Sequence, residues 1–139
     1  MKPRSSRNSA LPNPVGSYVP VTTLDALTRQ IPLDRLDLIK LDIEGSELEA
    51  LKGATETIRR FNPRFVMEFF SVAICAVRRT SPIFLLEFIL DRFGSFSFLD
   101  EGKVITVSTH AEAVEFMVRN MVRAKTNVDD IAFGGREGA

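Results

Sequence analysis

The sequence has 139 residues, the size of one domain and enough to bury about two-thirds of the surface exposed by the unfolded chain. Hydrophobic residues make up 45% of it, including eleven Phe, so the composition indicates a folded chain and excludes an intrinsically disordered one. Eighteen basic and eighteen acidic side chains give a formal net charge of zero. No global field would therefore attract nucleic acid or an anionic membrane, and we expect neither as a partner.

Cysteine and histidine are too few for two common kinds of site. Cys75 is the single cysteine and cannot form an internal disulfide, and His110 is the single histidine, so no zinc site of usual composition can form. We therefore predict no metal site and a reducing, cytoplasmic location. The basic N-terminus lacks the apolar core of a secretory signal, and the apolar run at 65–77 is too short to span a membrane.

The first third of the chain predicts a leader, a short extended piece and a helix. Residues 1–17 combine Ser, Asn, Pro and Arg without hydrophobic periodicity, which is typical of a flexible leader. YVPV at 18–21 favours extended structure. TTLDALTRQ at 22–30 favours a helix that Thr22 or Thr23 caps.

The stretch RLDLIKLDIEGSELEALKG at 35–53 predicts a strand, a tight turn and a helix. Its aliphatic residues at 35–43 are typical of a buried strand in a parallel sheet. Ser46 and Glu49 then form an S-x-x-E capping box, which predicts that a helix begins there and continues until Asn62.

The second half of the chain repeats this alternation. A second apolar run at 64–72 predicts a strand, and a stripe of apolar side chains at helical spacing predicts a helix that Ser81-Pro82 opens and Gly94 closes. FSFL and KVITVS flank an Asp-Glu-Gly turn and predict a hairpin. A helix over about 111–124 and a short strand over 131–133 complete the pattern.

Alternating strands and helices predict an α/β fold with an open, mostly parallel sheet, helices on both faces and an antiparallel strand at one edge. We place one domain at 18–134, between the leader at 1–17 and a tail at 135–139.

Three charged residues fall on one face of the strand predicted at 35–43. Because side chains alternate along a strand, Lys40, Asp42 and Glu44 point away from the aliphatic residues between them. Burying unpaired ions is costly, so these groups must be paired or must open onto a cleft. The carboxyl ends of parallel strands border such a cleft.

Two interpretations fit these charges. In the first, Lys40 pairs with a neighbouring carboxylate, and Glu44 interacts with the dipole of the next helix. In the second, Asp42 and Glu44 bind a polar substrate, a cation or a cofactor amine, and Lys40 sustains their ionisation. Glu68, a carboxylate within the next predicted strand, favours the second because it could reach the same cleft.

Three blocks of the sequence, in this order, carry a resemblance to a known family. VPVTTLDAL at 19–27, DLIKLDIEGSELEALKGA at 37–54 and PRFVMEF at 63–69 resemble the C-terminal half of the FkbM-type methyltransferases, which are S-adenosylmethionine-dependent enzymes. TNVDDIAF at 126–133 is similar to the closing strand of that family. The resemblance implies the C-terminal strands and helices of a Rossmann-like methyltransferase sheet.

The resemblance also implies roles for the charged residues. Asp42 would lie nearest the methyl donor, Glu44 and Glu68 would position or deprotonate an acceptor hydroxyl, and Lys40 would support them electrostatically. The acceptor would be a small molecule or a saccharide. Correct positioning would supply much of the rate, since the methyl group of the sulfonium is already activated.

One part of the family pattern is not found in this sequence. The family carries a Gly-rich D-x-G-x-N-x-G turn after an earlier strand, and Gly16 is the only glycine before Lys40. We therefore expect a truncated methyltransferase that self-associates or uses an N-terminal half supplied in trans, since an uncovered strand edge recruits partners. The alternative is a non-catalytic remnant or interaction module without the cofactor pocket.

Overall fold

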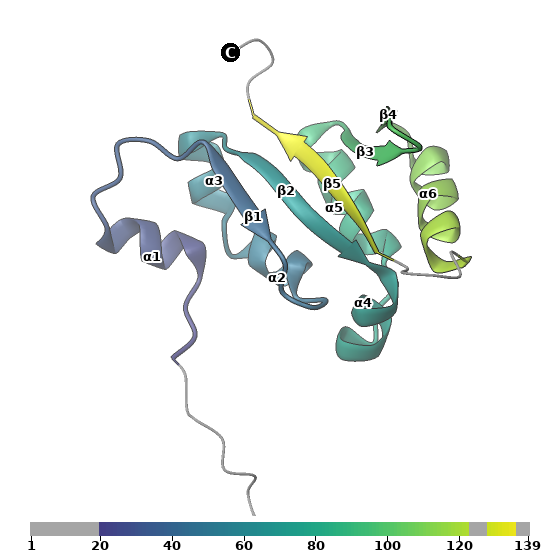
Figure 1. Ribbon diagram of the computed structural model, residues 1–139. Helices are drawn as coiled ribbons and strands as arrows, with labels where there is room; N and C mark the ends of the chain where they lie inside the picture. Colours follow the sequence, from purple (N-terminus) through teal and green to yellow (C-terminus); the bar gives the residue numbers. More distant parts are fainter. Residues whose placement is uncertain (1–19, 123–127, 136–139) are drawn as a thin grey trace, which may run out of the picture.

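The computed structural model describes residues 20–122 and 128–135. The predicted leader at 1–17 and the tail beyond residue 135 lie outside these residues. The described elements follow in chain order (Figure 1): α1 Leu24–Gln30, β1 Leu38–Leu41, α2 Glu47–Lys52, α3 Thr55–Phe61, β2 Arg64–Phe70, α4 Ser71–Arg78, α5 Ile83–Phe93, β3 Phe96–Asp100, β4 Lys103–Val107, α6 His110–Val122 and β5 Val128–Gly134.

The five strands form one sheet in the order β1-β2-β5-β3-β4. Among the described strands, only β1 and β2 pair in parallel, and the three other pairings are antiparallel. The prediction of a mostly parallel sheet is therefore wrong. The reason is the last strand, which follows α6 and enters the sheet between β2 and β3, antiparallel to both. The expected antiparallel strand at one edge is confirmed as β4.

The core lies on one face of this sheet. Burial alternates along β2, where Phe65, Met67 and Phe69 are buried and the residues between them are partly exposed. Phe116 of α6 packs on Phe69 and Phe98 on the same face. Figure 1 shows α2, α3 and α5 behind the sheet and no described helix in front of β1, β2 and β5.

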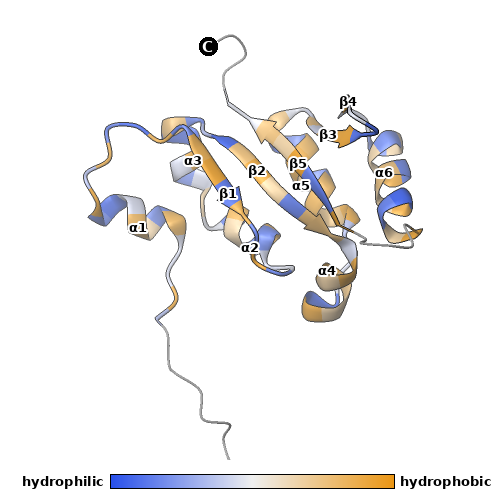
Figure 2. Ribbon diagram, in the orientation of Figure 1, coloured by the Kyte–Doolittle hydropathy of each residue, from blue (hydrophilic) through white to orange (hydrophobic). Residues whose placement is uncertain are grey.

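For the described residues, the prediction of helices on both faces of the sheet is therefore wrong. The central strands are mainly hydrophobic in Figure 2, which fits their packing against these helices. We call the opposite face of β1, β2 and β5, which the described helices leave uncovered, the open face.

Local predictions were met in part. The hairpin is confirmed as β3 and β4, and the helices predicted around 22–30, 81–94 and 111–124 are confirmed as α1, α5 and α6. The single helix expected from Ser46 to Asn62 is two helices, α2 and α3, broken at Gly53 and Ala54. Helix α4 was not predicted, because its residues continue an apolar run that periodicity alone cannot assign.

Residues 20 and 21 form no strand, and β1 is shorter than the predicted 35–43.

No helix among the described residues is long and apolar enough to cross a membrane.

The first family block attaches α1 to α3. Thr23 caps α1, and the Asp25 carboxylate accepts hydrogen bonds from the backbone amides of Glu56 and Thr57, at 3.1 and 2.8 Å, and from the Thr57 hydroxyl at 2.7 Å. Burial of Asp25 raises its pKa, but these hydrogen bonds and nearby Arg29 outweigh burial, so the pKa is lowered. Asp25 therefore acts in folding, by satisfying the free amides at the start of α3.

Candidate functional site

The turn after β1 places the charged residues of the central motif. The strand ends at Leu41, and Glu44 and Gly45 then adopt positive φ angles of 54° and 92°. A Cβ atom on Gly45 would lie 2.9 Å from the carbonyl oxygen of Ala73 in α4, so a larger residue would clash with that helix. Glycine lets this turn pack against α4 and start α2 immediately afterwards.

Glu47 stabilises this turn from inside. Its side chain is buried, and its Oε1 accepts hydrogen bonds from the backbone amides of Ile43 and Gly45, each at 3.2 Å. Sequence reasoning assigned no role to Glu47, although it is the last acid of the K-x-D-x-E-G-x-E motif. A buried carboxylate that accepts hydrogen bonds from backbone amides fixes the backbone that carries Asp42 and Glu44.

The predicted capping box at Ser46 and Glu49 is wrong. The Ser46 side chain makes no cap hydrogen bond to α2, and its hydroxyl accepts a hydrogen bond from Arg78 Nη2 at 2.6 Å. Arg78 also lies 3.7 Å from the Glu49 carboxylate. Arg78 of α4 thus draws both side chains away from the N-terminus of α2.

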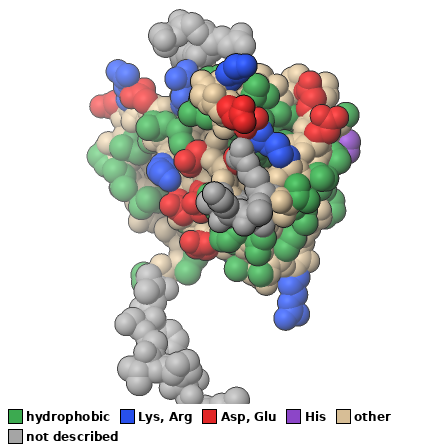
Figure 3. Space-filling view, turned by 45° about the vertical axis from the view of Figure 1, so that its right-hand side comes forward, with side chains coloured by type: hydrophobic (Ala, Val, Ile, Leu, Met, Phe, Trp, Pro, Cys, Tyr) green, Lys and Arg blue, Asp and Glu red, His purple; other side chains and the backbone are tan. Residues whose placement is uncertain are grey.

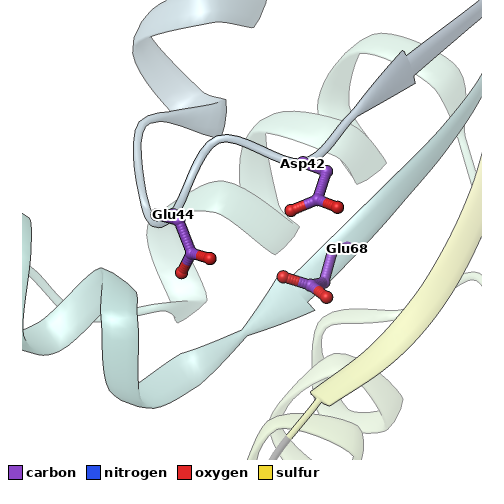
Figure 4. Close-up of side chains that lie close together, drawn as sticks. All are labelled: Asp42, Glu44 and Glu68. Carbon is purple, nitrogen blue, oxygen red and sulfur yellow. The ribbon is translucent and has the colours of Figure 1, made fainter.

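Three carboxylates from this motif and from β2 lie close together (Figure 4). Asp42, Glu44 and Glu68 each offer one oxygen, and these oxygens lie within 4.8 Å of one another. We call these three residues the acidic cluster. The structure thus brings together the three carboxylates selected from the sequence. Their individual roles stay predictions.

The charges of the acidic cluster are only partly balanced. Lys40 Nζ lies 3.7 Å from Asp42 Oδ2, with both side chains about half exposed. Burial, followed by the charges of Asp42, Glu44 and Asp130, raises the pKa of Glu68, while Lys40 opposes this effect. A carboxylate with a raised pKa is suited to accept a proton near neutral pH, so Glu68 is a candidate base.

Both interpretations drawn from the sequence are met in part. Lys40 pairs with a carboxylate, as the first one expected. The expected interaction of Glu44 with the dipole of α2 stays a prediction, and Glu47 binds the amides of Ile43 and Gly45 in the same turn. The clustering of Asp42 and Glu44 with Glu68 is what the second interpretation required.

Among the described residues, the acidic cluster lies more open to solvent than the expected cleft. Asp42 and Glu44 are exposed, and Glu68 is half-buried on the open face of the sheet. A hollow of about 740 Å³ lies on the other face of β1, and we call it the apolar hollow. Its lining includes Val21, Leu24, Leu27, Ile39, Leu41, Ile43, Ala50 and Phe65. Alternation along β1 therefore separates a charged face from an apolar one.

The donor set of the cluster suits a positively charged group. Three carboxylates at this spacing can hold a cation, an ammonium group or a sulfonium. Figure 3 shows acidic, basic and hydrophobic side chains interspersed on the face of the molecule that it presents, without one large patch of a single charge. Attraction for a ligand would thus come from this local arrangement.

The carboxyl ends of the parallel strands β1 and β2 carry these acids, which is consistent with a methyltransferase domain. The family model of the methyltransferase FkbM domain matches residues 3–120 of the chain. The chain therefore belongs to the methyltransferase FkbM family, as its sequence motifs predicted. Comparison with curated proteins gave no match, and no solved structure matched.

Proposed function

We propose that this chain forms the acceptor side of an O-methyltransferase site that uses S-adenosylmethionine. The observation that carries the proposal is the convergence of Asp42, Glu44 and Glu68 beside the carboxyl ends of two neighbouring parallel strands. Ligands of α/β sheets bind at such strand ends. Membership of a methyltransferase family supplies the class of reaction.

Each charged residue then has a role. S-adenosylmethionine, when bound, supplies a methyl group activated by a positively charged sulfur. Asp42 attracts that charge, and Glu44 orients the acceptor hydroxyl. Glu68 accepts the hydroxyl proton, because burial and the neighbouring acids raise its pKa. Lys40 limits the repulsion between the three acids.

The residues present fit the positively charged end of the cofactor. Its nucleoside end is bound in this class of fold by a Gly-rich turn, which this sequence does not contain. We therefore include in the proposal an N-terminal half that supplies this turn and docks along the edge of β1 that pairs with no described strand. The acceptor is a hydroxyl of a small molecule or a saccharide.

A second candidate function is a non-catalytic interaction module. The observation that favours it is the edge strand β1, which pairs with β2 on one side and with no described strand on the other. In this case, the cluster and the edge would serve binding alone.

Calorimetry with S-adenosylmethionine and with its demethylated product separates the two functions. Micromolar binding, by the chain alone or with an added N-terminal half, supports the methyltransferase. Absence of binding, both to the chain alone and to the chain with the added N-terminal half, supports the interaction module and contradicts the methyltransferase.

In an active preparation, Glu68→Gln should lower kcat by roughly 100-fold or more if Glu68 accepts the proton. Glu115→Gln is the matched control, because Glu115 is an exposed glutamate of α6. Equal turnover of Glu68→Gln and the control would refute the assigned base.

A further inference from the structure

The outer edge of β1 is free among the described residues. The amide of Arg64 donates to the carbonyl of Asp37 at 2.8 Å, so the backbone groups of Asp37, Ile39 and Leu41 face β2. By the same alternation, the N–H and C=O groups of Leu38 and Lys40 point away from the sheet. Such an edge is a template for another strand.

We propose that a second copy of this chain pairs with this edge, with β1 antiparallel to β1 of the partner subunit and a two-fold axis at Leu41. Lys40 then lies opposite Asp42 of the partner subunit, and Asp42 lies opposite Lys40 of the partner subunit. Lys40 lies in a hydrogen-bonded pair, since its backbone groups face outward, and the pairing with Asp42 extends β1 past its end at Leu41. Ile39 lies opposite Ile43 of the partner subunit on the apolar face.

Charge complementarity selects this register. Two antiparallel copies related by an axis perpendicular to the sheet place residues of the same face opposite each other. An axis at Lys40 would oppose two ammonium groups, and an axis at Asp42 would oppose two carboxylates. Each of these registers contains a like-charge pair, although the axis at Asp42 would also bring Lys40 opposite Glu44 of the partner subunit. The axis at Leu41 gives two pairs of opposite charge and no like-charge pair.

The acidic cluster provides a further reason for this partner. It joins three carboxylates, and Lys40 of the same chain contacts one of them. In the proposed dimer, Lys40 of the partner subunit reaches the same cluster through Asp42. The second copy therefore contributes a cation to a site with an excess of negative charge.

Apolar side chains at the edge would gain cover in the same dimer. Leu38 is 56% exposed and Ile43 is 40% exposed. Ile39, Leu41 and Ile43 line the apolar hollow, so the hollows of the two copies would meet at the axis. Burying such groups together stabilises association.

This inference goes beyond the proposed function. Pairing between two copies and docking of an N-terminal half would use the same edge, so adding that half should dissociate the dimer. The dimer is tested by the molar mass of the protein in solution, and the methyltransferase function is tested by cofactor binding. Either proposal can therefore be refuted without refuting the other.

Sedimentation equilibrium of the full chain tests the proposal through a charge exchange. Wild type should be a dimer. Lys40→Asp opposes aspartates, and Asp42→Lys opposes lysines, so each variant alone should dimerise at least tenfold more weakly than wild type. Mixed in equal amounts, the two variants should form a heterodimer, which native mass spectrometry identifies. Lys52→Asp, a charge reversal on exposed Lys52 of α2, should leave the dimer intact.

The double variant Lys40→Asp/Asp42→Lys restores both pairs with exchanged signs and should dimerise like wild type. If a single variant does not fold, the double variant still tests the proposed register, because it keeps both pairs of opposite charge. A monomeric wild type, a monomeric double variant, or single variants that dimerise as tightly as wild type would each overturn the proposal.

Discussion

Replacing Glu47 with alanine should destabilise the protein and loosen the acidic cluster. The substitution removes the acceptor of two backbone amides, those of Ile43 and Gly45, in a turn where Gly45 is buried. Hydrogen bonds to a charged group contribute about 1.5–3 kcal/mol each, and an unsatisfied buried amide costs about 1–3 kcal/mol. Both ranges describe the loss of the same hydrogen bonds, so they are not added together. We expect a loss of about 3 kcal/mol in the free energy of unfolding.

Glu47→Gln is the matched variant. It keeps a carbonyl oxygen for the same amides and removes the charge of a carboxylate whose Oε2 has no hydrogen-bond partner among the described residues. We expect it to change the free energy of unfolding by less than about 1 kcal/mol, since lost charge-assisted bonding and relieved charge burial oppose each other.

Urea unfolding measures both variants. For a domain of this size, a loss of about 3 kcal/mol in the free energy of unfolding corresponds to a fall of roughly 10 °C in Tm. The reasoning would be refuted if Glu47→Ala were as stable as Glu47→Gln, because the two differ mainly in the acceptor that they offer to the turn.

Two further predictions concern pH. Asp25→Ala should lose about 1–2 kcal/mol at pH 7, as expected for a helix cap. Because the folded pKa of Asp25 is lowered, its contribution is complete above the unfolded value of 3.8 and disappears as the pH falls through the folded pKa. Urea unfolding at pH 7 and pH 3 should show the deficit shrink, and a constant deficit would contradict the role of the charge. Glu68→Gln should instead be more stable than wild type at pH 7, by up to about 1 kcal/mol, since it removes like charges on neighbouring strands. Its raised folded pKa makes wild type lose stability as the pH rises from the ordinary 4.5 through that pKa, so the two proteins should converge below about pH 4. Equal stability at all pH values would show that the cluster is not repulsive.

The two faces of β1 explain why one motif supports two proposals. Its apolar residues line the apolar hollow, whereas Lys40 and Asp42 lie beside Glu68 on the open face. A methyl acceptor would use the charged face, and an added strand would use the edge between the two faces. Measurements of binding and of mass therefore probe different parts of one short segment.

The sequence by itself determined the features that depend on neighbouring residues. The hairpin of β3 and β4 follows from two alternating runs around Asp-Glu-Gly, and α1 follows from its Thr cap and apolar spacing. Alternation along the segment from Lys40 to Asp42 placed both charges on one side. Local periodicity is enough for such conclusions, because 3.6 and 2 residues per repeat fix which side chains share a face.

Only the tertiary structure decided the features that depend on distant residues. The position of β5 between β2 and β3 made the sheet mostly antiparallel, and no local pattern specifies which strands become neighbours. Arg78 drew Ser46 and Glu49 away from capping, although their spacing fits a capping box. Glu47 became a buried acceptor, because the fold closed over the turn beside α4. At Ser46 and Glu49, a long-range contact with Arg78 outweighed a local capping preference worth about 1 kcal/mol.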